Sequence, residues 1–397
     1  MTQPAGGGDD YDIFSAAYRN DPFPQWAALR SRCPIARSDL WGGSWMPLRY
    51  EDIRDIARDA ERFSNRSTEV AGPPSAAARL LLPPLTSDPP EHKSDRDMLV
   101  PFFSQKKAAA LEPFIRERSR ALVGDIAAAG GGDAIAGFAQ TLTLDVLIRV
   151  LGVAPDTPLA QWLIRMIRLG GKDQSVRAET VREILSYLGG LVDRVADPPS
   201  GDDGDDLITY LAGAEIGGTP LSRRQKVGTA FMVLLAGADT TWSALGAGLW
   251  HLALVPSDRR RLGADPSLTE NATEEFLRAF TPVNVGRLAN TDVEIHGRCI
   301  RANQRVLLNY GAANRDPDVF DDPDRVRLDR ADNHRHLAFG AGPHRCLGSN
   351  IARLQIKVGL EEWLRLIPEF HLSDPGAIDW TGAQVRGPDR LDITVDR

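Results

Sequence analysis

The chain has 397 residues, of which 42% are hydrophobic and 25% are charged, values typical of a globular protein with a large core. Lysine and arginine total 47 against 54 acidic residues, and this net charge of −7 argues against a nucleic-acid-binding surface. The three cysteines are far apart in the sequence, so neither a disulfide framework nor an iron–sulfur cluster is indicated. The composition therefore predicts a protein of a reducing cytoplasm.

The N-terminal segment carries no targeting signal. It lacks a basic start and an apolar run, and no apolar run elsewhere reaches the length of a membrane span. We therefore expect neither a membrane anchor nor a span. A glycine- and aspartate-rich stretch predicts a disordered tail over residues 1–20. A single domain is expected over 21–397, because motifs spread from His92 to Gly348 must converge on one site.

Helical patterns dominate the chain, punctuated by proline and glycine. Short β patterns occur over residues 45–49, 292–298, 305–309 and 391–395. The first polar motif in chain order is His92-Lys-Ser-Asp-Arg96, which places a histidine and an arginine one turn apart on one helical face. The predicted fold class is mainly α with small β sheets.

One predicted helix is much longer than the others. Ser222 and Gln225 form a capping box, and the helical pattern continues to about Leu254, before Pro256. Its central turns are apolar on all sides, so the helix should be buried. Asp239 follows these turns, and a buried carboxylate is costly unless it is partnered or functional. The plain alternative is a satisfied core aspartate followed by a threonine, Thr240, that bonds back to the helix.

A second helix carries Glu275 and Arg278, three residues apart on one face. Ser267 and Glu270 predict a capping box at its start. Taken alone, the Glu275 and Arg278 pair is typical of an exposed ion pair worth a few tenths of a kcal/mol.

The most informative segment is Phe339-Gly-Ala-Gly-Pro-His-Arg-Cys-Leu-Gly348. It places Cys346 where a glycine-rich loop meets the start of a helix, and backbone N–H groups with the helix dipole favour a thiolate there. A thiolate in such a loop is suited to ligate haem iron, with Gly342 and Gly348 allowing close approach of the backbone. The alternative is a small buried hydrophobic side chain, the usual fate of a free thiol.

This segment resembles the haem-binding loop of cytochrome P450, Phe-Gly-x-Gly-x-His-x-Cys-x-Gly, and residues 236–241 resemble the family's Ala-Gly-x-Asp-Thr-Thr. The resemblance extends from about Asp21 to the C-terminus. It implies the P450 fold, a triangular prism with haem b (iron protoporphyrin IX) between the long central helix and the cysteine loop. It also implies Cys346 as the metal ligand, and Asp239 with Thr240 as the catalytic acid–alcohol pair beside bound dioxygen.

The same resemblance assigns the other site residues. The cofactor-binding residues are His92, Arg96, Ala236, Arg287, Phe339, Gly340, His344, Cys346 and Gly348, with basic groups clamping the haem propionates and His336 as a weaker candidate. A buried structural network is implied for Glu275, Arg278 and Arg325. The pocket for the substrate is expected to include Met232, Leu235, Val283, Val285 and Val385. Arg79, Arg168 or Arg386 could anchor a substrate carboxylate, and each could equally face solvent.

The function implied by the resemblance is a monooxygenase that inserts one oxygen atom from O2 into a small hydrophobic substrate, such as a terpenoid or small aromatic. Electrons are expected from a separate ferredoxin and ferredoxin reductase. Their docking residues would be Lys106, Lys107, Arg345, Arg353 and Lys357, which could equally be ordinary solvated side chains. Three alternatives stay open: a peroxygenase, a non-oxygenating P450 that isomerises, dehydrates or couples substrates, and a haem-thiolate sensor or electron carrier.

Overall fold

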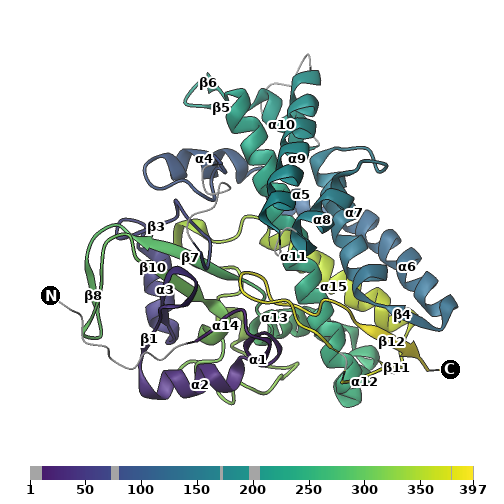
Figure 1. Ribbon diagram of the computed structural model, residues 1–397. Helices are drawn as coiled ribbons and strands as arrows, with labels where there is room; N and C mark the ends of the chain where they lie inside the picture. Colours follow the sequence, from purple (N-terminus) through teal and green to yellow (C-terminus); the bar gives the residue numbers. More distant parts are fainter. Residues whose placement is uncertain (1–10, 73–79, 170–172, 196–205, 377, 397) are drawn as a thin grey trace.

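Helices make up most of the computed structural model, and strands gather mainly beside α1, α2 and α3 (Figure 1). The structure describes residues 11–72, 80–169, 173–195, 206–376 and 378–396. The α-helices are α1 (Ala16–Asn20), α2 (Phe23–Arg32), α3 (Tyr50–Arg58), α4 (Glu91–Leu99), α5 (Gln105–Ala109), α6 (Glu112–Ala129), α7 (Gln140–Leu151), α8 (Leu159–Arg168), α9 (Gln174–Arg194), α10 (Leu207–Gly213), α11 (Arg223–Leu254), α12 (Pro256–Ala264), α13 (Thr269–Ala279), α14 (Tyr310–Ala313) and α15 (Ser349–Leu366).

The strands are short and form four small sheets. They are β1 (Ile35–Ser38), β2 (Ser44–Pro47), β3 (Phe63–Ser64), β4 (Gly131–Asp133), β5 (Glu215–Ile216), β6 (Thr219–Pro220), β7 (Asn284–Ala289), β8 (Val293–Ile295), β9 (Arg298–Ile300), β10 (Arg305–Asn309), β11 (Phe370–Leu372) and β12 (Asp392–Val395). The largest sheet has the order β1-β2-β10-β7-β3, and β4 and β11 flank β12 in a second sheet. The predicted strand at 305–309 is confirmed, and the β pattern at 292–298 is confirmed as part of the hairpin formed by β8 and β9.

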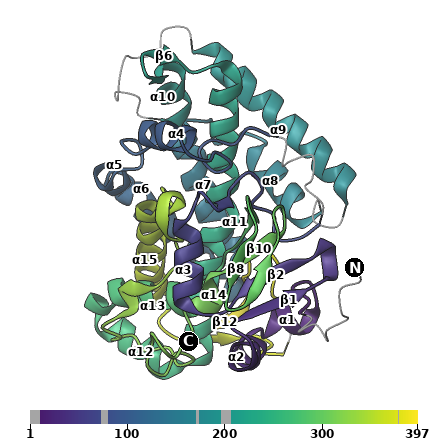
Figure 2. The same ribbon diagram turned by 90° about the vertical axis from the view of Figure 1, so that its left-hand side faces the viewer.

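Helix α11 passes through the molecule from the end that carries β5 and β6 to the end that carries α12 (Figure 2). The predicted capping box is present: the Ser222 hydroxyl accepts from the Gln225 N–H, and the Gln225 side chain accepts from the Ser222 N–H at 3.0 Å. By length and mean hydropathy this helix would qualify as a membrane span, which the apolar runs had not predicted. However, 72% of its most apolar window is buried inside the fold, as in a core helix.

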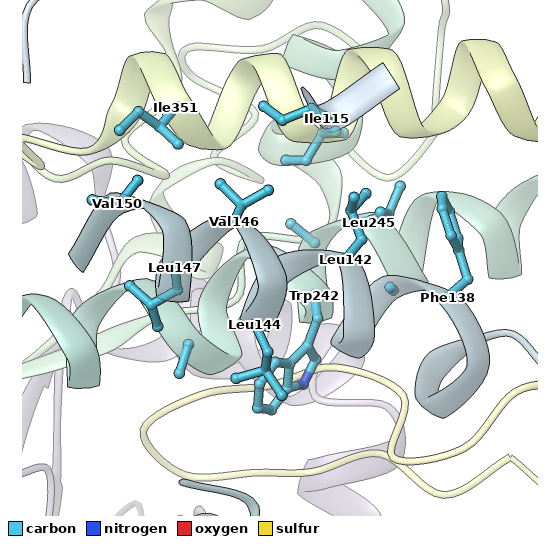
Figure 3. Packing of buried hydrophobic residues seen from close by; sticks show 14 of the residues in the cluster. Ile115, Phe138, Leu142, Leu144, Val146, Leu147, Val150, Trp242, Leu245 and Ile351 are labelled. Atoms are coloured by element: carbon cyan, nitrogen blue, oxygen red, sulfur yellow. The ribbon is translucent and has the colours of Figure 1, made fainter. Parts of the chain in front are cut away.

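Helices α6, α7, α11 and α15 build the main hydrophobic core (Figure 3). Val146 and Val150 of α7 lie toward Ile351 of α15, whereas Leu144 of α7 lies beside Trp242 of α11. Helix α7 approaches α11 closely at Gly237, where an added Cβ would meet the Leu147 side chain at 3.0 Å. The core therefore fixes the central turns of α11 relative to α15, which follows the cysteine loop.

The predicted disordered tail over residues 1–20 is wrong for residues 11–20, and residues 1–10 lie outside the described residues. Tyr11, Ile13 and Tyr18 are buried in a core cluster with Trp26 and Met46. The Tyr11 hydroxyl bonds to Ser44, so burial of aromatic side chains outweighs the glycine-rich composition that precedes them. The first ordered helix, α1, belongs to this cluster.

The helix that carries Glu275 begins differently from the prediction. Ser267 lies in a short 3₁₀ helix, Pro266–Leu268, whose cap is Asp265, and α13 starts at Thr269 without a side-chain cap. The Asp265 carboxylate accepts from the Ser267 N–H at 3.1 Å and from its hydroxyl at 2.6 Å. The Asp265 carboxylate therefore takes the Ser267 N–H and hydroxyl, the donors that the predicted capping box would use.

Candidate active site

The cysteine loop is shaped by two glycines in the left-handed region. Gly340 has φ 72° and Gly342 has φ 68°, and a Cβ added at Gly342 would meet the Ala57 carbonyl oxygen at 2.6 Å. A side chain at this position would therefore push the loop away from α3. The Cys346 N–H donates to the Phe339 carbonyl oxygen at 2.8 Å, and α15 begins at Ser349. The predicted placement of Cys346 at the entrance to a helix is confirmed.

Burial and the polar groups around the Cys346 thiol act on its pKa in opposite directions, and burial has the larger effect. Burial raises the pKa of the Cys346 thiol, while the Gly348 N–H and three nearby arginine charges act in the opposite direction. The residue nevertheless keeps exposed surface, so it borders open space. A metal ion that binds the sulfur removes the proton outright, and the N–H and guanidinium groups then stabilise the thiolate.

Four basic side chains gather next to this loop. The rings of His92 on α4 and His344 in the loop lie 4.0 Å apart between centroids. Arg96 is one turn after His92, and Arg287 on β7 is 3% exposed. Strand pairing places Arg287 opposite Val306, on a strand that lies between β10 and β3 in the largest sheet. The structure thus brings together all four residues that were predicted to clamp two carboxylates.

Two ring nitrogens of this basic cluster have no hydrogen-bond partner in the described part of the chain. Burial lowers the pKa of His344 to about 2, with further lowering by the charges of His92, Arg287 and Arg96. The Nε2 atoms of both histidines are buried without a hydrogen-bond partner. Among the described residues, no carboxylate forms an ion pair with Arg287, whose pKa burial lowers. Such groups fit the two propionates of a haem.

Helix α11 exposes a narrow strip of its surface at Ala236. Ala236 is exposed although its neighbours Leu234 and Ala238 are fully buried. One turn later, the Thr240 hydroxyl donates to the Ala236 carbonyl oxygen at 3.1 Å. Burial raises the pKa of Asp239 to about 6. A carboxyl group with a raised pKa therefore lies next in sequence to the Thr240 hydroxyl, on the turn that follows Ala236.

Comparisons with known proteins agree with this arrangement. The model of the family described as Cytochrome P450 matches residues 163–376. A mycinamicin IV hydroxylase/epoxidase from Micromonospora griseorubida is 34% identical over 360 residues, covering 88% of this chain and 89% of the relative. The chain belongs to the cytochrome P450 family. Its members bind haem and act as oxidoreductases, and this chain is a P450 monooxygenase by that membership.

Other P450 relatives match nearly the whole chain. A vitamin D(3) 25-hydroxylase from Pseudonocardia autotrophica is 30% identical over 401 residues, which is 98% of this chain and 97% of the relative. The crystal structure of CYP101J2 superposes with a TM-score of 0.88 at 26% identity, covering 100% of both chains. The structure of the mixed-function P450 MycG superposes with a TM-score of 0.84 at 30% identity, covering 97% of this chain and 99% of that chain. These matches confirm the predicted P450 fold.

The buried network around Glu275 contains a different arginine from the one predicted. The Arg278 guanidinium donates two bonds of 2.8 Å to Glu275, and both side chains are 0% exposed. The third member is Arg330, whose Nε lies 3.1 Å from both Glu275 oxygens. The Arg325 side chain is exposed, and only its carbonyl oxygen joins the network. The predicted role of the Arg325 side chain was therefore wrong, because this side chain is exposed to water on the turn that precedes Arg330.

A second acidic residue, Glu274, was missed by the sequence analysis. Its carboxylate accepts from Arg353 at 2.6 and 2.9 Å and contacts His336 Nε2 at 3.1 Å. His336 is thus bound to Glu274 and does not join the propionate cluster, for which it was the weaker candidate. The signal in the sequence was the adjacent pair of glutamates on a helix packed against the loop.

The predicted pocket residues divide between α11 and two backbone segments that run side by side. Val283 and Val385 form an antiparallel bridge, and both are half-buried, as are Leu235 and Val285. Met232 is 7% exposed. The bridge is reinforced where the Asn284 side chain donates to the Ala383 carbonyl oxygen at 2.8 Å. The contact of these residues with a substrate stays a prediction.

The two arginines considered as carboxylate anchors that the structure describes, Arg168 and Arg386, bind backbone carbonyl oxygens. Arg386 is buried, donates to the carbonyl oxygens of Arg19 and Asn20 at 2.8 Å, and lies 4.0 Å from the Trp380 ring centroid. Arg168 donates to the Asp389 carbonyl oxygen at 3.2 Å. Arg79 lies outside the described residues. Arg386 therefore fixes the C-terminal loop to the N-terminal segment.

The raised pKa of Asp239 predicts a stability change with pH. Between about pH 4 and 6 the folded chain keeps a proton that the unfolded chain has lost, so the free energy of unfolding falls as pH rises through this window. We expect Asp239→Asn to raise it at pH 7.5 by up to about 3 kcal/mol, since each pKa unit is worth about 1.4 kcal/mol. The gain should vanish below about pH 4 in urea unfolding curves.

A matched control is Asp173→Asn at the exposed N-cap of α9. Hydrogen bonds from Ser175 and Val176 lower the pKa of Asp173, so its replacement should reduce stability at pH 7.5. Equal stability of Asp239→Asn and the parent protein at both pH values would contradict the buried, proton-binding role of this carboxyl group.

Proposed function

We propose that this P450 inserts one oxygen atom from O2 into an apolar substrate, by hydroxylation or oxidative dealkylation, with haem b held between α11 and the Cys346 loop. The main support is that one fold contains both the Cys346 loop and a strip of α11 that carries Ala236, Asp239 and Thr240. When bound, thiolate-ligated haem binds dioxygen and favours cleavage of its O–O bond. A cytoplasmic location is part of the proposal, since all three cysteines are free.

The chain's own residues would bind the cofactor and move protons. Cys346 supplies the thiolate, and His92, Arg96, Arg287 and His344 bind the propionates. Thr240 uses its hydrogen on the Ala236 carbonyl, so its oxygen lone pairs remain able to hold a water molecule beside Ala236. Burial raises the pKa of the Asp239 carboxyl to about 6, so it can hold a proton closer to neutral pH than an ordinary aspartate can.

Thr240→Ala tests the oxygenase function. The variant should bind haem and substrate normally and still consume NADH, but should release hydrogen peroxide in place of oxygenated product. Asp239→Asn should slow turnover on the order of 10²-fold, because a positioned proton donor typically contributes 10²–10⁴. Thr241→Ala is the control, since its side chain points about 100° away around the helix. The measurement is product and peroxide formed per NADH oxidised.

Full coupling in Thr240→Ala would contradict this role and favour the alternatives. A peroxygenase or a P450 that isomerises, dehydrates or couples substrates has little need of a proton relay on α11. A haem-thiolate sensor would show no turnover in any variant. The spin shift on adding substrate distinguishes the sensor from the enzymes, since it requires a molecule bound beside the iron.

The substrate is proposed to be a small hydrophobic molecule, such as a terpenoid or small aromatic. The support is the apolar character of Leu235, Val283, Val285 and Val385 together with the engagement of Arg386 elsewhere. Two relatives named above are a mycinamicin IV hydroxylase/epoxidase and a vitamin D(3) 25-hydroxylase. A panel of terpenes, methoxyarenes and fatty acids, read by the haem spin shift, would decide among these classes.

We also propose that a ferredoxin, reduced by its reductase, docks beside the cysteine loop. A cleft of about 200 Å³ opens there, and its charged lining includes Arg58, Arg345 and Arg353. Among the described residues no carboxylate pairs with Arg58 or Arg345, and both are exposed. Of the predicted docking residues, Arg353 and Lys357 are instead paired with Glu274 and Glu361. Arg58 was not predicted.

Reversing these free charges should weaken docking of an acidic partner. In Arg58→Glu/Arg345→Glu, the ferredoxin concentration needed for half-maximal haem reduction should rise about tenfold or more at low salt, and the difference should shrink as salt increases. Arg224→Glu, at the N-terminal end of α11, is the control. Unchanged reduction kinetics in the double variant would exclude this cleft as the docking surface.

A further inference from the structure

Glu274 connects α13 to the cysteine loop through two side chains. Arg353 Nε and Nη2 bind its two oxygens at 2.6 and 2.9 Å, a bidentate contact that fixes the guanidinium plane. His336 Nε2 lies 3.1 Å from the same carboxylate, and the His336 side chain is 2% exposed. Burial alone would raise the pKa of Glu274, but hydrogen bonds from His336 and Arg353 hold it at about 2.

Both partners of Glu274 meet the ring of Phe339. The Arg353 guanidinium carbon lies 4.4 Å from the ring centroid, and the His336 ring lies 5.8 Å from it at an interplanar angle of 48°. Phe339 is also tied to the iron-ligating residue, because its carbonyl oxygen accepts from the Cys346 N–H at 2.8 Å. One carboxylate therefore holds two side chains that contact the same aromatic ring.

These contacts lie at the lining of the open cleft beside the loop. His336, Phe339 and Arg353 all line the cleft of about 200 Å³, which also reaches Gly340 and Gly342. A ring that moves there would widen the path for water from this cleft toward the sulfur of Cys346. Water that reaches a thiolate donates hydrogen bonds to the sulfur, and these draw electron density from it and weaken its bond to iron.

We propose that Glu274 is a positioning residue that holds Arg353 and His336 against Phe339, and so keeps the Cys346 thiolate shielded from water. The inference rests on the proposed haem site. Failure of this inference can be distinguished from failure of the haem site. Cys346→Ala tests whether the thiolate ligates iron, whereas the variants below test only how long that ligation persists. The Glu275 network is separate, since no hydrogen bond joins Glu274 to Arg278 or Arg330 among the described residues.

The test uses the haem-loaded protein and the absorption band of its reduced carbon monoxide complex. In Glu274→Gln we expect the thiolate-type band to form and then decay on the order of tenfold faster, since loss of an outer-shell partner of a metal ligand typically costs 10–100-fold. Arg353→Lys should decay similarly, because lysine keeps the charge but loses the bidentate contact and the stacking on Phe339. Glu361→Gln is the matched control, an α15 carboxylate paired with Arg116 and Lys357 at 2.9 Å.

A double-mutant cycle with Phe339→Leu separates positioning from general stability. If Glu274 acts through the ring, Glu274→Gln should add little to the decay rate in the Phe339→Leu background. Additive effects would overturn the proposal, because they would mean that Glu274 stabilises the protein independently of Phe339. Decay in Glu274→Gln as slow as in Glu361→Gln would also overturn it.

Discussion

Replacing Cys346 with alanine should abolish the thiolate-type absorption band of the reduced carbon monoxide complex. The sulfur is the group in this loop that can bind iron as a thiolate, and the N–H and guanidinium groups around it have no ligand to stabilise once it is removed. Cys346→His should bind haem through nitrogen and likewise lack the band. The measurement is the difference spectrum of the purified, haem-reconstituted variants.

Cys33 and Cys299 provide matched controls for this result. Cys33 is 7% exposed and its thiol donates to the Ile35 carbonyl oxygen, whereas Cys299 is exposed on the β8–β9 hairpin. Alanine variants of both should keep the band. Survival of the thiolate spectrum in Cys346→Ala would contradict the proposed haem ligand and with it the proposed reaction.

Glu275→Ala should leave little haem-loaded protein. Its carboxylate is the shared partner of two guanidinium groups that are 0% and 1% exposed, so its removal strands buried positive charge at a cost of about 3–5 kcal/mol. A domain's net stability is roughly 5–15 kcal/mol, so this loss is a large share of it. The measurements are the haem content of the purified variant and its free energy of unfolding.

A comparison of two arginines makes this prediction specific to the observed network. Arg330 is fully engaged, with Nε on Glu275 and with Nη1 and Nη2 on the carbonyl oxygens of Asp321 and Asp322 at 2.6 and 3.1 Å. Arg330→Ala should therefore be nearly as damaging as Glu275→Ala, whereas Arg325→Ala should change stability by less than about 0.5 kcal/mol. The reverse order would mean that Arg325 is the buried partner.

The prediction of Arg325 where the structure has Arg330 shows why part of the network could not be predicted from the sequence. A helix sets the spacing of Glu275 and Arg278 by its own geometry, so their pairing follows from the sequence. Residues 321–332 form an irregular turn in which no periodicity assigns side chains to the inside or outside. Burial of Arg330 depends on carbonyl oxygens of the turn and on α13, which lies far away in the sequence.

The sequence by itself determined the features that local geometry controls. The capping box at Ser222, the helical spacing of His92 and Arg96, and the positive-φ glycines around Cys346 all depend on residues within a few positions of one another. The P450 family and fold followed from these motifs. Only the tertiary structure decided that residues 11–20 join the core, that Arg330 binds Glu275, and that Glu274 reaches Phe339 through Arg353 and His336. Each of these depends on burial and pairing between segments distant in the chain, which local propensities do not encode.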